Sequence, residues 1–238
     1  MTTTADQPMI VPMFQGIHCA RTGERVGAEA LARWFWHGDW SGPLEHPMFP
    51  AWPKVDQASL RFLIRNAHVV AAQYPAISIN VCPDTLNSED TFRLWREMVT
   101  ALLEKADLKL VAEVTERVSD QLLADSWDKL ADLNVPLYMD DFGHQFSTLS
   151  RLQEYPWDGC KFNIKTISAT PDCPGTESAL SLCHDQGINT VAEQVETQHL
   201  LAKARQLEFD WLQGFHFGRA QMLMQSGEVC GTHKACHY

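Results

Sequence analysis

Apolar residues follow two alternating patterns along this chain. Short runs rich in branched aliphatic residues alternate with longer segments in which apolar residues recur every three or four positions. The first pattern predicts buried strands and the second predicts amphipathic helices. We predict strands at residues 10–19, 25–34, 76–80, 108–116, 136–143, 159–164, 188–196 and 209–213. We predict helices at residues 53–73, 88–105, 119–133, 147–153, 176–186 and 197–207, and a loop that could wall a pocket at residues 35–53.

This order of elements predicts a closed barrel. The first two strands are joined by the tight turn Arg21–Gly23, so they must pair antiparallel, because a parallel return needs a crossover of a dozen or more residues. The later strands alternate with helices, which is the rhythm of repeated βα units. Eight strands close a barrel better than they fill an open sheet. The expected fold is therefore an α/β, TIM-like (β/α)8 barrel with the first strand antiparallel.

The strand PLYMDDFG, residues 136–143, ends on two adjacent carboxylates, Asp140 and Asp141. Like charges this close need a positive partner, and a divalent metal would supply it; an ordinary acidic loop after a strand is the alternative. Other predicted strands also carry polar residues near their ends. In barrels of this class such residues meet at the carboxyl ends of the strands. They are Glu29, Asn80, Glu113, Asp140, Lys161, Glu193 and Gln213.

This set points to phosphodiester hydrolysis. Carboxylates and an amide oxygen form a hard oxygen set that suits Mg²⁺ or Mn²⁺, with enough ligands for two ions. Two such ions polarise a phosphoryl oxygen and activate a water. Lys161 would stabilise the developing negative charge, and Glu193 could take the proton from the water. Acyl transfer is disfavoured because the chain has no GxSxG motif. For Glu29 and Arg33, an internal ion pair is an equally good reading of the residues alone.

Composition narrows the choice of partners. The chain has 238 residues, of which 45% are hydrophobic, and a formal net charge of −11. This charge argues against binding of long nucleic acid, whereas a small anionic ligand is compatible with a local metal. We expect no membrane span and a cytoplasmic protein. The seven cysteines include no CxxC pair, so reduced thiols are expected. We divide the chain into a flexible N-terminus (1–9), one domain (10–225) and a tail (226–238).

Seven motifs in order resemble the EAL domain family, bacterial phosphodiesterases that linearise cyclic di-GMP to pGpG. They run from about Phe14 to Arg219 and read FQGIHCARTGERVGAEALARW, SIN, VAEVTE, MDDFG, KFN, VAEQVE and QGFHFGR. The resemblance implies a barrel whose first strand is antiparallel, two Mg²⁺ or Mn²⁺ ions per site, inhibition by Ca²⁺, and a homodimer.

The resemblance also implies a role for each matching residue. Metal ligands are Glu29, Asn80, Glu113, Asp140 and, for the second metal, Asp141. Lys161 contacts the attacking water or the phosphate, and Glu193 is the base. The guanine or phosphate of the substrate is contacted by Gln15, Arg33 and Gln213. Supporting acids are Glu116, which steadies the loop after Asp141, and Glu196.

Several positions depart from the family pattern. Asn163 stands where the family has an Asp, and Gln194 where it has a Gly. His144 and Gln145 replace a small residue and a Gly in the loop after MDDFG. A family stretch similar to FIPLAE is reduced to HPMFPAW, residues 46–52. Rate, regulation and substrate affinity are the properties that these changes affect.

Three alternatives remain open from the sequence. The chain could be a catalytically silent receptor for cyclic di-GMP, or a protein-interaction module. A barrel that stabilises an enolate with Mg²⁺ would also use acids and a Lys, but it explains neither Arg33 nor Gln15. In the tail, Cys230, His233, Cys236 and His237 could hold a soft metal, or the tail could be disordered.

Overall fold

The computed structural model describes residues 9–36, 38–42, 51–169 and 174–224. Three sequence predictions therefore fall, wholly or in large part, outside the described residues. They are the flexible N-terminus 1–9, the HPMFPAW stretch 46–52, and the tail 226–238 with its Cys and His residues.

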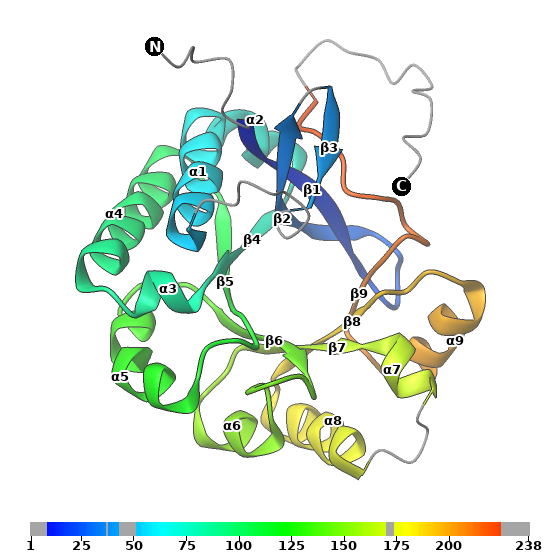
Figure 1. Cartoon of the computed structure of the whole chain (residues 1–238). Helices are drawn as coiled ribbons and strands as arrows, with labels where there is room; N and C mark the ends of the chain where they lie inside the picture. The colour runs from blue at the N-terminus through cyan, green and yellow to red at the C-terminus, as the bar shows by residue number, and fades with distance from the viewer. Residues whose placement is uncertain (1–8, 37, 43–50, 170–173, 225–238) are drawn as a thin grey trace, which may run out of the picture.

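Eight strands form a closed barrel with helices around it (Figure 1), which confirms the predicted fold class. The strands run in the order β1-β9-β8-β7-β6-β5-β4-β2, and pairing of β1 with β2 closes the ring. Their bounds are β1 Met9–Cys19, β2 Arg25–Trp36, β4 Ala76–Val81, β5 Lys109–Val114, β6 Leu137–Phe142, β7 Gly159–Asn163, β8 Asn189–Glu193 and β9 Trp211–Gln213.

Strand β1 is antiparallel to both of its neighbours. It pairs with β2 in a long hairpin that places Gln15 opposite Glu29, and with β9 through Ile17 opposite Gln213. The other pairings within the ring are parallel. The prediction of an antiparallel first strand is confirmed, because the short turn after Cys19 allows no crossover.

The sequence predicted a loop over residues 35–53, but part of this segment is regular secondary structure. Strand β2 continues to Trp36, and a short strand β3, Asp39–Ser41, pairs antiparallel with it outside the ring. Gly38 lies in the connecting turn at a φ of +93°, which Gly adopts without strain. The rings of Phe35 and Trp40 are 4.9 Å apart across the pair. A three-residue strand is too short for alternation to reveal it in the sequence.

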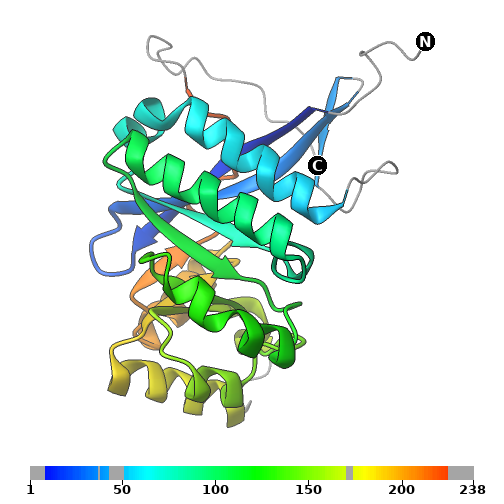
Figure 2. The ribbon, with the colours of Figure 1, turned by 90° about the vertical axis from the view of Figure 1, so that its left-hand side faces the viewer.

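The helices surround the barrel, and α1 and α4 lie side by side on its outside (Figure 2). The predicted helix 53–73 is in fact two, because the backbone departs from helical geometry at Asn66, with φ −111° and ψ 17°. The Asn66 side chain donates to the carbonyl of Phe62. The short helices α3 and α7 were not predicted. Bounds are α1 Trp52–Arg65, α2 Ala67–Gln73, α3 Pro83–Leu86, α4 Glu89–Lys105, α5 Asp120–Ala131, α6 Leu149–Glu154, α7 Ile164–Ala169, α8 Pro174–Gln186 and α9 Gln198–Gln206.

Hydroxyl side chains begin several of these helices. Ser88, Ser119 and Thr197 accept hydrogen bonds from backbone amides in the first turns of α4, α5 and α9, as their positions before the helices predict. Helix α6 begins later than expected, with Thr148 as its cap, which leaves Ser147 free for the site described below. Gly187 ends α8 at a φ of +70°.

The main core lies between the barrel and its helices. Its largest buried side chains include Trp95, Phe162 and Leu123. Polar and charged side chains, by contrast, are buried at one end of the barrel interior. Among the residues described, no helix is both long enough and apolar enough to span a bilayer.

Candidate functional site

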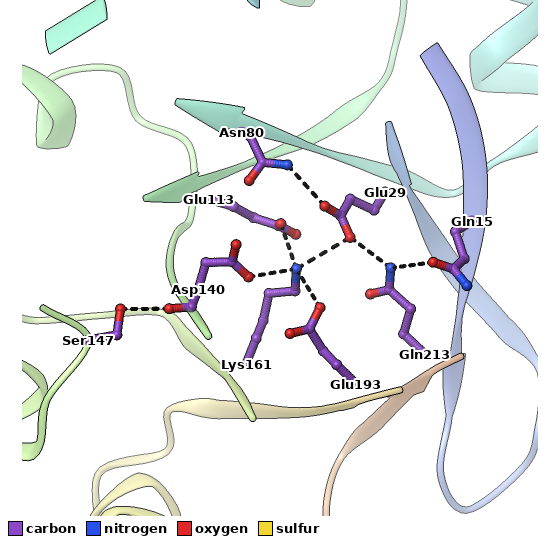
Figure 3. A network of polar contacts seen from close by, with 9 residues as sticks. All are labelled: Gln15, Glu29, Asn80, Glu113, Asp140, Ser147, Lys161, Glu193 and Gln213. Carbon is purple, nitrogen blue, oxygen red and sulfur yellow. Dashed lines mark hydrogen bonds and ion pairs between the residues drawn. The ribbon is translucent and has the colours of Figure 1, made fainter. Parts of the chain in front are cut away.

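One buried ammonium group lies among four carboxylates (Figure 3). The side-chain nitrogen of Lys161, on β7, is 2.7 Å from Glu113, 2.9 Å from both Asp140 and Glu193, and 3.3 Å from Glu29. The four acids come from four different strands, β5, β6, β8 and β2. Only 2% of the Lys161 side chain is exposed, and the acids are 1–15% exposed. Folding therefore brings the predicted acids together around Lys161.

Strand register explains this convergence. Asn80 pairs with Glu113 across β4 and β5, and Asn163 pairs with Glu193 across β7 and β8. Because the parallel strands all run in one direction, their carboxyl ends emerge on the same rim. Gln15 reaches this rim from the middle of β1, since the antiparallel register sets it opposite Glu29.

Amides hold Glu29 in place. Gln213 Nε2 donates to Glu29 Oε2 at 2.7 Å and lies 3.4 Å from Gln15 Oε1, and Asn80 Nδ2 donates to Glu29 Oε1 at 2.9 Å. Both carboxylate oxygens of Glu29 are thereby fixed. Gln213 Oε1 is buried and accepts no hydrogen bond within the described part of the chain.

Burial and crowding shift the pKa values of this cluster. Burial raises the pKa of Asp140 to about 6 and that of Glu193 to about 8, against the opposing effect of Lys161. Burial and the neighbouring Glu29 raise the pKa of Glu113 well above its usual range. Burial also acts to raise the pKa of Glu29, but Lys161, Gln213 and Asn80 bring it below its usual value. The four acids outnumber their single cation, so some of these carboxyl groups stay protonated at pH values at which exposed carboxyl groups are ionised.

The donor set fits a hard divalent cation in its chemistry. Four carboxylates and the Asn80 amide supply oxygen ligands of the kind that Mg²⁺ and Mn²⁺ prefer. Added positive charge would also release the protons that the crowded acids retain. Among the described residues, however, no three His, Cys, Asp or Glu side chains already stand as a ligand cluster. The carboxylates are directed at Lys161 Nζ instead, so a metal would have to compete with this ammonium.

Asp141 stands beside the network and outside its ion pairs. Its backbone φ of +49° lies in the left-handed region, and its carbonyl accepts from the His144 amide. Its negative charge raises the pKa of both Asp140 and Glu193, which places it near them. Ser147 donates a 2.6 Å hydrogen bond to the carbonyl of Asp140 and so ties the following loop to β6. A lone Ser gave no sequence signal for this contact.

Arg33 and Glu116 lie at a neighbouring cavity. Both line a space of about 270 Å³ that shares Asn80 with the carboxylate cluster. Arg33 donates to the carbonyl of Ala32, and the carbonyl of Glu116 accepts from the amide of Phe146 in the loop after β6. The described structure shows no Glu29–Arg33 ion pair, which the residues alone had left open.

Asn163 and Glu196 serve an adjacent helix. Asn163 Oδ1 accepts from the backbone amides of Lys165 and Thr166 and so caps α7. Glu196 pairs with Lys165 at 2.7 Å on a partly exposed surface. Neither contacts Lys161 in the hydrogen bonds and ion pairs of the described residues. Their contacts position the segments that follow β7 and β8.

Comparison with known protein families shows to which family this chain belongs. The sequence matches the EAL domain over residues 3–220. The chain belongs to the EAL domain family. Its resemblance in seven motifs is thus supported over nearly the whole chain.

Relatives of this EAL domain include longer proteins. An uncharacterized protein of Azorhizobium caulinodans is 29% identical, over 92% of this chain and 32% of the relative. RocR of Pseudomonas aeruginosa, named as a cyclic di-GMP phosphodiesterase, is 28% identical over 83% of this chain and 54% of the relative. The chain therefore spans between about a third and a half of the length of these two relatives.

Solved structures share the barrel of this EAL domain. The Bacillus subtilis YkuI protein, in complex with substrate c-di-GMP and calcium, aligns with a TM-score of 0.77 at 19% identity. The alignment covers 94% of this chain and 58% of that one. An EAL domain protein from Listeria monocytogenes aligns with a TM-score of 0.75 at 24% identity, over 90% and 89% of the two chains. At these identities the likeness concerns the fold.

Two residues that depart from the EAL pattern lie at backbone positions where a side chain is unfavourable. Gln145 and Gln194 have φ values of +43° and +55°, in the left-handed region where Gly is favoured. A side chain there costs roughly 1–2 kcal/mol relative to Gly. The backbone is therefore strained at two positions close in sequence to the carboxylates, because Gln194 directly follows Glu193 and Gln145 lies in the loop after Asp141.

Proposed function

We propose that this chain hydrolyses one phosphodiester bond of cyclic di-GMP to give linear pGpG, with Mg²⁺ or Mn²⁺ as cofactor. The observation that carries the proposal is the cluster of four carboxylates around the buried ammonium of Lys161, two of them buried and two half-buried, with Asn80 beside it. Membership of the EAL domain family and the named activity of RocR support the choice of substrate.

The oxygen donors are assigned to two metal ions. The side chains that would hold them are Glu29, Asn80, Glu113, Asp140 and Asp141. When bound, such ions supply Lewis-acid polarisation of a phosphoryl oxygen and of the attacking water. The raised pKa values of Glu113 and Asp140 support this assignment, because added positive charge would favour their ionised forms.

Glu193 and Lys161 would carry the proton and charge steps. The water oxygen forms a bond to phosphorus while the bond from phosphorus to the ribose 3′ oxygen breaks, and the released 3′ oxygen takes up a proton from solvent to give the hydroxyl of pGpG. Glu193 takes the proton from the water, a role that suits a carboxyl whose pKa burial has raised to about 8. The ammonium of Lys161 stabilises negative charge on the phosphoryl oxygens. Its pKa lies well above the usual range because, although burial opposes this, four carboxylates favour the charged form.

Substrate contacts are assigned to three side chains. Gln213 Oε1 is a buried acceptor without a partner among the described residues, so it is available to a donor group of the ligand. Gln15 lies beside it at the rim. Arg33 lines the adjoining cavity, where its guanidinium can pair with a phosphate oxygen. Asn163, Glu116 and Glu196 would support the surrounding loops.

A catalytically silent receptor for cyclic di-GMP is the second candidate. It is favoured by one observation: Lys161 already neutralises the carboxylates that a metal needs, in ion pairs of 2.7–3.3 Å. A cation that cannot displace this ammonium would leave the chain able to bind a nucleotide without hydrolysing it. Partner proteins would then recognise the chain with the nucleotide bound.

One incubation separates the two candidates. Purified chain is mixed with cyclic di-GMP and Mg²⁺ or Mn²⁺, and the nucleotides are resolved by chromatography. We expect pGpG to accumulate, and Glu113→Gln to reduce turnover at least about 100-fold with an unchanged circular dichroism spectrum. Unchanged substrate together with measurable binding would favour the receptor. Inhibition by Ca²⁺, a homodimer and a cytoplasmic location remain predictions, to be tested by added Ca²⁺, light scattering and cell fractionation.

A further inference from the structure

A small inner cavity lies in the barrel, one layer of side chains below the carboxylate cluster. Because side chains alternate along a strand, residues two positions before the cluster residues face the same interior. Ser78, Tyr138 and Trp211 line the cavity in this way, and Glu113 and Lys161 border it from the cluster. Its volume is about 40 Å³, whereas one buried water needs only about 10–15 Å³. The cavity therefore has room for water but not for a nucleotide.

The hydroxyl of Ser78 is a buried polar group at this cavity. Ser78 lies on β4 and is 4% exposed, and its Oγ has no hydrogen-bond partner among the described residues. A buried hydroxyl without a hydrogen bond is unfavourable, and ordered water commonly satisfies such groups. Cavities that stay empty are apolar. The Ser78 hydroxyl therefore favours water as the occupant.

Glu113 supplies a second polar group. Its Oε2 accepts from Lys161 Nζ at 2.7 Å, whereas its Oε1 receives no hydrogen bond from the described residues (Figure 3). Ser78 lies on the neighbouring strand, two positions before the residue that pairs with Glu113. A water between the two side chains can accept from the Ser78 hydroxyl and donate to the carboxylate. It then has the two partners that a buried water needs at least.

Aromatic rings form a firm wall of the inner cavity. The rings of Tyr138 and Trp211 stack at 5.9 Å with an interplanar angle of 15°. Tyr138 also lies against Gly159, where a Cβ would be 2.4 Å from its ring. Because packed side chains of this kind relax only partially, they do not move in to fill the space.

We propose that the inner cavity holds an ordered water, and that Ser78 is a positioning residue that orients the Glu113 carboxyl group through this water. The part that concerns the metal rests on the proposed function, in which Glu113 is a metal ligand. Ligating carboxylates are commonly held by hydrogen bonds from neighbouring groups. Gln213 and Asn80 hold Glu29 in this way, and the Ser78 water does so for Glu113.

The sign of a stability change tests the water without metal or substrate. Ser78→Ala removes one oxygen atom and adds no bulk. If the hydroxyl had no partner, its removal would stabilise the protein, whereas loss of a hydrogen bond to a held water destabilises it. We expect the melting temperature of the full chain in EDTA to fall by about 2–4 °C. An unchanged or higher melting temperature would overturn the proposal.

Titration with Mn²⁺ tests the positioning role with a readout other than turnover. The signal of the free ion in electron paramagnetic resonance gives the dissociation constant. We expect Ser78→Ala to bind Mn²⁺ about 3- to 10-fold more weakly than the parent, below the roughly 10- to 100-fold loss of a direct partner, because the contact runs through a water. The Mn²⁺ concentration for half-maximal turnover should rise by the same factor. Equal Mn²⁺ affinities of Ser78→Ala and the parent would remove the positioning role.

Ser78→Thr and Ser78→Val form a matched pair, because the two side chains have the same shape and only Thr keeps the hydroxyl. Thr should keep the Mn²⁺ affinity within about twofold of the parent, and Val should share the loss seen with Ala. Ser126→Ala, at a buried position on α5, should leave the Mn²⁺ affinity unchanged. Equal affinities of the Thr and Val variants would show that the hydroxyl has no such role.

These outcomes also separate the inference from the proposed function. Weaker Mn²⁺ binding in Ser78→Ala without turnover in any variant leaves the inference standing and removes the hydrolase. Turnover with an Mn²⁺ affinity that ignores Ser78 leaves the hydrolase and removes the inference. If the parent binds no Mn²⁺, the metal-dependent function fails, and the melting temperature in EDTA still decides whether the Ser78 hydroxyl holds a water.

Discussion

The ammonium nitrogen of Lys161 lies 2.7 Å from Oε2 of Glu113, and both side chains are almost fully buried. Three more carboxylates share this nitrogen within 3.3 Å. Removing one member of a buried ion network is strongly destabilising, because the remaining charges lose their compensation. Lys161 therefore sets the charge balance of the whole centre.

Replacing Lys161 with Met should destabilise the metal-free protein. Four acids would lose their common cation, and we expect the free energy of unfolding in EDTA at pH 8 to fall by about 3–5 kcal/mol. Mn²⁺ should raise the melting temperature of this variant more than that of the parent, because the cation no longer competes with an ammonium. Urea and thermal unfolding with and without Mn²⁺ measure both effects.

Lys165→Met is the matched control for this substitution. Lys165 also forms an ion pair at 2.7 Å, with Glu196, but its side chain is 44% exposed. Exposed pairs contribute about 1 kcal/mol or less. Equal losses in the two variants would show that Lys161 does not compensate the buried acids.

Stability of the metal-free chain should fall as the pH rises from about 4.5 to 8. The pKa values of Asp140, about 6, and Glu193, about 8, are raised in the folded protein by burial. In this window the folded protein binds more protons than the unfolded chain, so the free energy of unfolding decreases by up to about 1.4 kcal/mol per pH unit for each group. Thermal unfolding in EDTA across this range measures the slope.

Two comparisons identify the groups behind this slope. Glu193→Gln should make the decrease shallower, above all between about pH 6 and 8, where Asp140 contributes little. Saturating Mg²⁺ should flatten the curve, because bound metal favours the ionised carboxylates. Stability that rises with pH over the same window in EDTA would contradict the assignment.

Gly214→Ala should disturb both the fold and the site. A Cβ on Gly214, whose φ is +154°, would lie 2.3 Å from the backbone nitrogen and oxygen of Val195. We expect a loss of about 1–3 kcal/mol in the free energy of unfolding. Turnover should fall as well, because the shift moves the adjacent Gln213 away from Glu29. Gly218→Ala, at a φ of +135° with open space around it, isolates the backbone effect from the steric one.

Arg151→Ala should loosen the loop that follows Asp141. Arg151 is buried, donates to Asp120 at 3.0 Å and to the Val118 carbonyl at 2.6 Å, and its guanidinium lies 5.7 Å from the centre of the Phe146 ring. We expect a loss of about 2–5 kcal/mol in the free energy of unfolding. Hydrogen exchange at the Gly143 amide, which donates to the Ser147 carbonyl, should accelerate more than exchange in β8.

Arg93→Ala provides the comparison for Arg151. Arg93 is exposed and pairs with Asp90 and Glu97 on the surface of α4. Its loss should change the free energy of unfolding by about 0.5 kcal/mol or less and leave exchange at Gly143 unchanged. Similar exchange rates at Gly143 in the two variants would remove Arg151 from the support of the loop.

The barrel could be predicted from the sequence because, after the first hairpin, strand pattern and helix pattern alternate along the chain. Each polar residue at a strand end, such as Asn80 or Glu113, follows a run that only a buried strand explains. Parallel strands then force those ends onto one rim. Strand β3 and the break at Asn66 escaped prediction because three residues, or one broken turn, are shorter than the period that reveals an element.

Contacts within the site were less predictable than its members. Spacing places Lys161 on the rim, but only packing shows that four acids share its single ammonium. Arg33 belongs to the neighbouring cavity, because its position on β2 directs it there. Asn163 caps α7, a helix too short to recognise in the sequence. Ser78 lies in an ordinary buried strand, and only the cavity beside it distinguishes it.

The antiparallel seam between β1 and β9 has a consequence for biosynthesis. Ile17 pairs with Gln213, so the ring closes only after nearly two hundred intervening residues have been made. A nascent chain that has emerged as far as β8 already presents Lys161 and all four acids, yet it lacks Gln213 to hold Glu29. The incomplete chain on the ribosome therefore exposes open sheet edges and an incomplete charge cluster. Chaperone protection during translation should matter more for this chain than for a protein with local strand pairing alone.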